Sequence, residues 1–254
     1  MKILLTLGAA AAVAAGATND GTTEAGTAPV TGTVTGRVVF EGEMPEIKPL
    51  TISADQAKGC THGDTHVDDK DMSLVVSDDG GIQYVAVTME VDGADPAKAP
   101  EEPVILDQKG CRFVPHMIVV PVGTTVSFAN SDDVSHNIHT YPIKNTPLNQ
   151  TVAAGGALEQ KMEKAEEVKV GCDIHPWMTS YVVVTEATHF AVTDASGAFS
   201  IEGVPPGKHT IEFWHEKGLK ATATVEVEVA ADGSSAPVEV KMGEKKRKGR
   251  GRGR

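Results

Sequence analysis

Aromatic residues and cysteines are scarce in this chain of 254 residues, and so is helical periodicity. Aromatic side chains make up only 4% of the sequence, and there are three cysteines. By contrast, 26 glycines and 14 prolines accompany a hydrophobic content of 40%, a composition typical of many short strands joined by turns. We therefore predict an all-β fold. Residues 159–167 are the one candidate for a short helix, and they lack the apolar stripe of a core helix.

Features of common enzyme classes are also missing. The sequence has no glycine-rich loop that would cradle a phosphate, no convincing pair of nucleophile and base, and no second cluster to hold a substrate-binding metal. Beyond the first 17 residues, no stretch is long and apolar enough to cross a membrane as a helix. We predict that the protein is neither an enzyme nor a transmembrane protein.

The first 17 residues have the pattern of a secretory signal. Lys2 precedes an apolar run over residues 3–13, and the small residues that end at Ala17 suit a signal peptidase. Residues 18–31 are rich in Thr, Gly and Ala and are expected to form a flexible spacer. The mature protein is therefore predicted to be exported after cleavage near Ala17, and to be periplasmic, secreted or held at the cell surface.

The most informative stretch combines three metal-binding side chains in one short loop. Cys172-x2-His175-x2-Met178 places a thiolate, an imidazole and a thioether close together, and His136 can supply a second imidazole from another strand. Two His, one Cys and a weak Met are the ligand set of a blue-copper centre. Val168, Val170 and Cys172 share one parity, so a strand that buries the valines also turns the thiol inward. The alternative is a buried Cys, a surface His and a core Met that only happen to be neighbours.

Residues 104–186 resemble the plastocyanin and amicyanin branch of the cupredoxins. The resemblance lies in Phe113-x-Pro115, then Val119-x3-Gly123-x2-Val126-x-Phe128-x-Asn130-x-Asp132, His136-Asn137 and the Cys172 loop, whose short step to Met178 matches amicyanin better. It implies a Greek-key β-sandwich with one type 1 copper bound by His136, Cys172, His175 and Met178. It also implies that the backbone amide of Asn137 supports the cysteine sulfur, and that His139 does not bind the copper.

The role of His116 is open, whereas His175 has a second predicted role besides metal binding. His116 could orient a ligand, join His139 in a second metal site, or only cap a strand. His175, followed by Pro176 and Trp177, is expected to present its outer imidazole edge near the surface, so we predict that electrons enter at His175 and Trp177.

The three cysteines can be divided by their chemistry. If a metal holds Cys172, then Cys60 and Cys111 remain to form a disulfide in an oxidising compartment. The alternative is a pair of free buried thiols.

The two ends of the chain outside residues 104–186 are predicted to form a second sandwich. Residues 188–242, with the turn Asp194-x2-Gly197 and the run Val204-Pro205-Pro206-Gly207, resemble the transthyretin-like sandwich that follows carboxypeptidase domains. The first strand of such a sandwich is missing there, but residues 32–42 supply a matching one. We therefore predict a discontinuous sandwich of residues 32–103 and 188–242 with the cupredoxin-like domain inserted. Three consecutive units, or a first segment that extends the cupredoxin sheet, are the alternatives.

The C-terminal residues 243–254 form a basic tail. Seven positive charges and one negative charge follow Gly243, whereas the whole chain carries a formal net charge of −12. Because the tail has no apolar residue to bury, we expect it to be disordered and to contact an anionic cell surface or the acidic body of the protein. Arg-Gly repeats bind nucleic acid in some proteins, but no nucleic-acid partner is expected for an exported one.

These observations predict an exported type 1 copper protein that carries single electrons to or from a redox protein. Because the chain is acidic, its charge would favour a basic redox partner. A copper storage or delivery module is the first alternative. A cell-surface binding protein with a structural copper site is the second.

Overall fold

A computed structural model describes residues 30–60, 67–221 and 225–243 of the chain, and in these residues the fold is entirely β. No helix in this part of the chain is long and apolar enough to span a membrane. The all-β prediction is confirmed, whereas a helix over residues 159–167 is wrong, because β11 and β12 occupy that stretch. The strands are β1 (Gly32–Phe40), β2 (Val75–Val76), β3 (Ile82–Gln83), β4 (Ala86–Met89), β5 (Val104–Gln108), β6 (Phe113–Val114), β7 (Met117–Pro121), β8 (Thr125–Asn130), β9 (His136–Tyr141), β10 (Asn149–Val152), β11 (Ala157–Lys161), β12 (Glu166–Gly171), β13 (Thr179–Thr185), β14 (His189–Val192), β15 (Ala198–Val204), β16 (Gly207–Trp214), β17 (Lys220–Ala221), β18 (Val225–Val229) and β19 (Val238–Gly243).

The strands β5–β13, which we call the inserted sandwich, form two sheets. One sheet has the order β10-β9-β12-β13-β7 and the other β11-β8-β5-β6. Alternation builds the core between them: in β8 the side chains of Val126, Phe128 and Asn130 are buried and those between them are only partly buried. Leu106, Ile138 and the valines of β12 and β13 complete this core.

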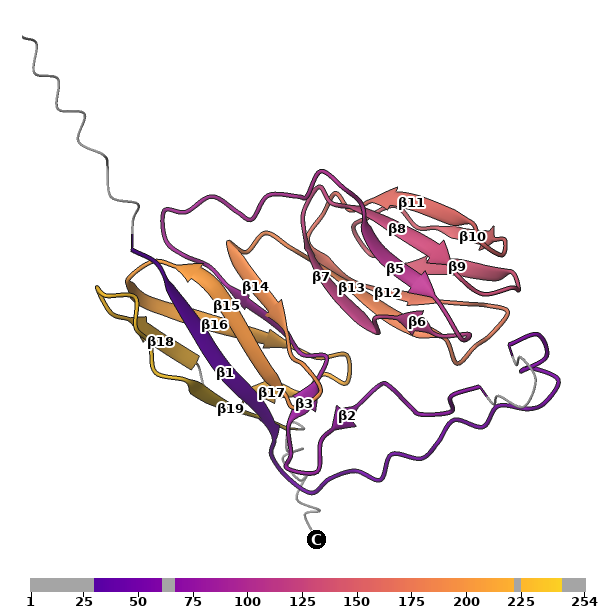
Figure 1. Cartoon of the computed structure of the whole chain (residues 1–254), viewed down its shortest axis with the longest axis horizontal. Helices are drawn as coiled ribbons and strands as arrows, with labels where there is room; N and C mark the ends of the chain where they lie inside the picture. Colours follow the sequence, from indigo (N-terminus) through magenta and orange to yellow (C-terminus); the bar gives the residue numbers. More distant parts are fainter. Residues whose placement is uncertain (1–29, 61–66, 222–224, 244–254) are drawn as a thin grey trace, which may run out of the picture.

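The strands β1, β4 and β14–β19 form a second body, which we call the split sandwich (Figure 1). β1 pairs antiparallel with β15 and parallel with β19, and β4 lies between β14 and β16. Strands from before and after the inserted sandwich therefore share both sheets. In the turn from β14 to β15, the carboxylate of Asp194 accepts hydrogen bonds from the backbone of Ser196 and Ala198, and Gly197 adopts a φ of +79°.

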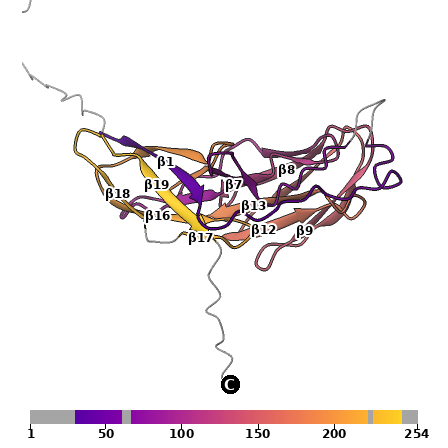
Figure 2. The ribbon, with the colours of Figure 1, turned by 90° about the horizontal axis from the view of Figure 1, so that it is seen from below.

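Residues 41–60 and 67–74, which we call the strap, join the two bodies a second time. The strap leaves β1, runs along the inserted sandwich and returns to β2 beside the split sandwich (Figures 1 and 2). Leu50, Ile52 and Val67 pack against the core of the inserted sandwich. The guanidinium of Arg112 donates hydrogen bonds to the backbone carbonyls of Asp68 and Lys70. The strap is thus fixed to the body that carries the candidate site.

Direct packing also joins the two bodies. Ala86, Met117, Val119 and Val183 form a small buried cluster between the sheets, with the aromatic rings of Tyr181, Phe190 and Trp214 against it. Beside this cluster, Nε2 of His116 lies 2.5 Å from a carboxylate oxygen of Glu216, and both side chains are almost fully buried.

Candidate metal centre

Four buried side chains from two neighbouring strands and one loop form the candidate site. His136 begins β9, Cys172 directly follows β12, and His175 and Met178 lie on the loop to β13. Exposed fractions are 0% for His136, 4% for Cys172, 4% for His175 and 0% for Met178. The burial pattern of β12 turns Val168 and Val170 inward together with Cys172, as its parity predicts.

Three potential ligand atoms converge. The Nδ1 atoms of His136 and His175 are 2.9 Å apart, and the sulfur of Cys172 is 3.9 Å from Nδ1 of His175. All three ligand atoms lie within 4.8 Å of one another. Hydrogen bonds close the loop, since the backbone N–H of Met178 donates to His175 and that of Cys172 donates to Met178. Met178 is therefore held in the same loop, and its role as a ligand stays a prediction.

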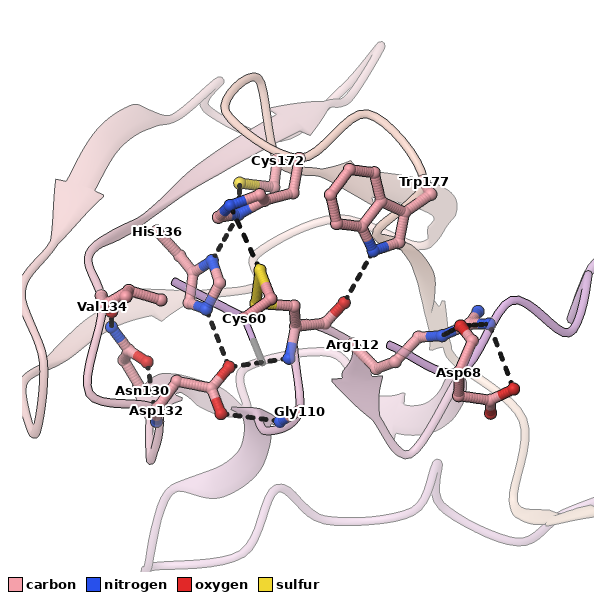
Figure 3. Close-up of a disulfide and its surroundings, with 12 residues drawn as sticks. Cys60, Asp68, Gly110, Arg112, Asn130, Asp132, Val134, His136, Cys172 and Trp177 are labelled. Atoms are coloured by element: carbon pink, nitrogen blue, oxygen red, sulfur yellow. Dashed lines mark hydrogen bonds and ion pairs between the residues drawn. A yellow bond between two sulfur atoms is a disulfide. The ribbon is translucent and has the colours of Figure 1, made fainter. Parts of the chain in front are cut away.

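The cysteine sulfur and the first histidine each have a defined partner. The backbone N–H of Asn137 points at the sulfur of Cys172 at 3.4 Å, in line with the role that the resemblance gave it. On the other side of the site, a carboxylate oxygen of Asp132 lies 2.8 Å from Nε2 of His136. The same carboxylate accepts hydrogen bonds from the backbone N–H groups of Gly110 and Cys111 (Figure 3). Asp132 orients the imidazole so that Nδ1 faces the site.

The sequence contained a weak signal for this contact. Asp132 stands four residues before His136 and belongs to the cupredoxin-like motif, yet the motif alone assigns it no role. Its function depends on the turn at Gly110 and Cys111, which is distant in sequence.

The predicted disulfide between Cys60 and Cys111 is confirmed, the alternative of two free thiols is wrong, and Cys172 is the one free cysteine. The position of the disulfide beside the candidate site was not predicted from the sequence. The sulfur of Cys60 lies 3.4 Å from Nε2 of His175, and Nε1 of Trp177 donates a hydrogen bond to the backbone carbonyl of Cys111 (Figure 3). The disulfide therefore covers the outer edge of the second histidine.

This cover contradicts one expectation. His175 and Trp177 were expected near the surface as the place where electrons enter, but they are only 4% and 9% exposed. The reason is the strap, which brings Cys60 onto the imidazole. The exposed residues of the loop are Asp173, Ile174 and Pro176 instead.

The electrostatics of the site favour a thiolate. Burial raises the pKa of the Cys172 thiol, but hydrogen bonds from His136, His175 and the amide of Asn137 outweigh it and lower the pKa to about 6. For His136, burial lowers the pKa, but the partners Cys172 and Asp132 outweigh it and raise the pKa above its ordinary value. Near neutral pH the sulfur is thus already in the form that binds metals.

The donor set fits copper. Two imidazole nitrogens suit either oxidation state of copper, and a thiolate favours Cu(I). The donors are buried and fixed by strands, so a copper ion held by His136, Cys172 and His175 would be shielded from water. Zinc uses the same kinds of donor, and analysis of the bound metal separates the two.

No protein-family model and no curated protein matches this chain. Among solved structures, a novel purple cupredoxin from Nitrosopumilus maritimus is 26% identical, with a TM-score of 0.29 over 32% of this chain and 99% of that one. A copper-containing nitrite reductase from Thermus scotoductus SA-01 is 28% identical, with a TM-score of 0.32 over 39% of this chain and 25% of that one. A mutant of amicyanin in its Cu(I) form is 20% identical, with a TM-score of 0.32 over 39% of this chain and 98% of that one. These TM-scores are too low for the ligands of those proteins to be transferred to this chain.

His116 and His139, the two other histidines singled out from the sequence, have separate partners. His116 lies at the contact with the split sandwich, where it pairs with Glu216 and its ring centroid is 5.2 Å from that of Tyr84. Nδ1 of His139 lies 2.9 Å from a carboxylate oxygen of Asp173, the residue after Cys172. In the part of the chain that the structure describes, the clusters of potential metal ligands include neither histidine. The structure gives His116 and His139 separate partners, and a second metal site made by them stays a prediction.

Proposed function

We propose that this protein is an exported type 1 copper protein that carries single electrons and catalyses no reaction of its own. His136, Cys172 and His175 would hold one copper ion, with Met178 as a weak fourth ligand. Bound copper would supply one-electron chemistry between Cu(II) and Cu(I). The observation that carries the proposal is the convergence of two imidazole nitrogens and a thiol in a buried, prearranged pocket.

The residues around the pocket serve this function by limiting rearrangement. His136 is fixed by Asp132, the sulfur of Cys172 receives the amide of Asn137, and the loop to Met178 is closed by its own hydrogen bonds. A site that keeps its donors in place in both oxidation states needs little reorganisation when an electron arrives or leaves. The burial of the donors also excludes water as an additional ligand.

The partner would approach a surface different from the one expected from sequence. Since the disulfide and the strap cover His175, the partner would contact these segments or the exposed Ile174 and Pro176 rather than the imidazole itself. The net charge of −12 would attract a basic redox protein over long distances, in an encounter that salt weakens. Export is inferred from residues 1–17, which, like residues 244–254 of the basic tail, lie outside the described residues.

A potentiometric titration tests the proposed function. The copper-loaded protein should pass reversibly between the oxidised and reduced states with one electron for each copper, and it should keep its metal through repeated cycles. Release of copper on either oxidation or reduction would contradict the proposal.

One observation favours a second candidate, copper storage or delivery. A ligand histidine that is only 4% exposed and lies under a disulfide is shielded from partners, which suits a protein that retains its metal. Binding confined to Cu(I), with loss of the ion on oxidation, would support this alternative. The transthyretin-like character of the split sandwich, and a role for it in binding a partner, stay predictions.

A further inference from the structure

The disulfide and His175 together contain a second set of soft metal donors. The sulfurs of Cys60 and Cys111 and one ring nitrogen of His175 lie within 4.8 Å of one another, and all three residues are buried. The contact to Cys60 is made by Nε2, at 3.4 Å, whereas Nδ1 faces His136 and Cys172. This second set therefore faces Nε2 of the imidazole, whereas the site already described faces Nδ1.

We propose that Cys60, Cys111 and His175 form a binding site for Cu(I) once the disulfide is reduced. A dithiol would supply the two electrons and two protons, so that Cys60 and Cys111 become thiols while the dithiol becomes a disulfide. On binding, the two thiols would release their protons to solvent, and the ion would be held by two thiolates and Nε2. Two thiolates and an imidazole are soft donors of the kind that Cu(I) prefers.

The two sulfurs would stay together after reduction because each belongs to a segment with its own attachments. The backbone N–H of Cys111 donates to Asp132, and its carbonyl accepts the indole N–H of Trp177. On the strap, the backbone N–H of Cys60 donates to Ala57. Further along, Arg112 and the apolar contacts of Leu50 and Ile52 hold the strap on the inserted sandwich. Only the covalent bond between the sulfurs needs to open.

The two sites share one imidazole. A neutral histidine offers one nitrogen as an acceptor while the other keeps its proton, so an ion at Nε2 competes with an ion at Nδ1. The site does not depend on the thiol of Cys172, and this allows it to be tested even if the proposed electron-transfer function is wrong.

The full-length Cys172→Ser protein provides the test, because its remaining thiols are Cys60 and Cys111. After reduction with a dithiol and removal of that dithiol under nitrogen, addition of Cu(I) should give ultraviolet thiolate-to-copper absorption that saturates at one ion per chain. The unreduced protein, whose sulfurs are still bonded to each other, is the matched control and should show no such absorption. Alkylation followed by mass spectrometry should show that Cu(I) protects both cysteines.

A second variant tests the histidine. In the reduced Cys172→Ser background, His175→Ala should weaken Cu(I) binding roughly tenfold or more in competition with a colorimetric chelator, since even the loss of a residue that only supports a ligand has an effect of that size. If the reduced chain loses its β-sheet circular dichroism, Cu(I) should restore it, because a ligand that binds the folded state stabilises that state. Absence of the absorption, alkylation that Cu(I) does not slow, unchanged affinity in the His175→Ala protein, or a reduced chain that stays unfolded with Cu(I) would each overturn the proposal.

Discussion

At the scale of single residues, the candidate site follows from alternation in one strand and spacing in one loop. Cys172 is turned inward because the valines two and four positions before it are buried. His175 and Met178 lie in the loop that immediately follows, so local sequence was enough to place them together with the sulfur. The two contacts that decide the environment of the histidines could not be predicted in this way. The carboxylate of Asp132 and the sulfur of Cys60 reach the site only because distant turns and the strap pack beside it.

The thiol of Cys172 makes the stability of the metal-free protein dependent on pH. A pKa that is depressed in the folded state, here to about 6, contributes stability above the unfolded pKa of about 8.5 and loses it as the pH falls through the folded value. The free energy of unfolding of the wild type minus that of Cys172→Ala should therefore decrease as the pH is lowered from about 8.5 to about 6. Urea unfolding with a chelator present measures this difference. A difference that grows toward acid pH would contradict the assignment.

Asp132 is predicted to act on the metal through His136. Replacing it with Ala removes the acceptor from Nε2 of His136, so the imidazole loses its fixed orientation and metal affinity should fall roughly 10-fold to 100-fold. Competition with a chelator measures the loss. Glu159→Ala, which removes an exposed acid of β11 in the same sandwich, is the matched control and should have a much smaller effect. Equal affinities of wild type and Asp132→Ala would show that the carboxylate does not position the ligand.

At the scale of elements, the strap is the part that sequence analysis could not anticipate. Residues 41–60 and 67–74 lack the alternation of a strand, and their path along the inserted sandwich is set by tertiary contacts such as those of Leu50 and Arg112. The cysteine count predicted the partner of Cys60, but a count carries no information on where the bridge lies. The edge strand β11 was missed for another reason: its side chains are only partly buried or exposed, so it shows little apolar periodicity.

The disulfide should contribute much of the stability of the inserted sandwich. Because it joins residues 51 positions apart, replacing both Cys60 and Cys111 with Ala should lower the free energy of unfolding by up to about 4 kcal/mol on the chain-entropy account. Urea unfolding of the metal-free protein, compared with wild type, measures the change. A double variant as stable as the wild type would show that the strap holds its position without the bridge.

At the scale of the whole molecule, two β-sandwiches are joined by one chain insertion, one strap and one buried contact. The strand Gly32–Phe40 could be associated with the C-terminal strands from sequence because both showed the pattern of one sandwich type. The contact between the bodies could not, since it combines a few residues of β4, β7 and β13 with aromatic rings of β13, β14 and β16.

The pair of His116 and Glu216 is predicted to stabilise this contact. Glu216→Ala leaves a buried imidazole nitrogen without its hydrogen-bond partner and should cost roughly 1–3 kcal/mol of unfolding free energy. Glu212→Ala, a change at an exposed position of β16, should have an effect within about 0.5 kcal/mol. Thermal and urea unfolding measure both variants. A similar small effect in the two would show that the hydrogen bond between His116 and Glu216 contributes little to the contact.

The absorption spectrum after addition of Cu(II) to the purified metal-free protein tests the central claim most directly. Copper bound by His136, Cys172 and His175 is expected to give an intense thiolate-to-copper band, so the oxidised protein should be blue to green. Metal analysis must accompany the spectrum because zinc would fill the same donors without colour. Cys172→Ser should lose the band, since a hydroxyl does not replace the thiolate, and Met178→Leu should keep it. A folded wild type that contains one Cu(II) and stays colourless, or a coloured Cys172→Ser protein, would contradict the type 1 copper assignment.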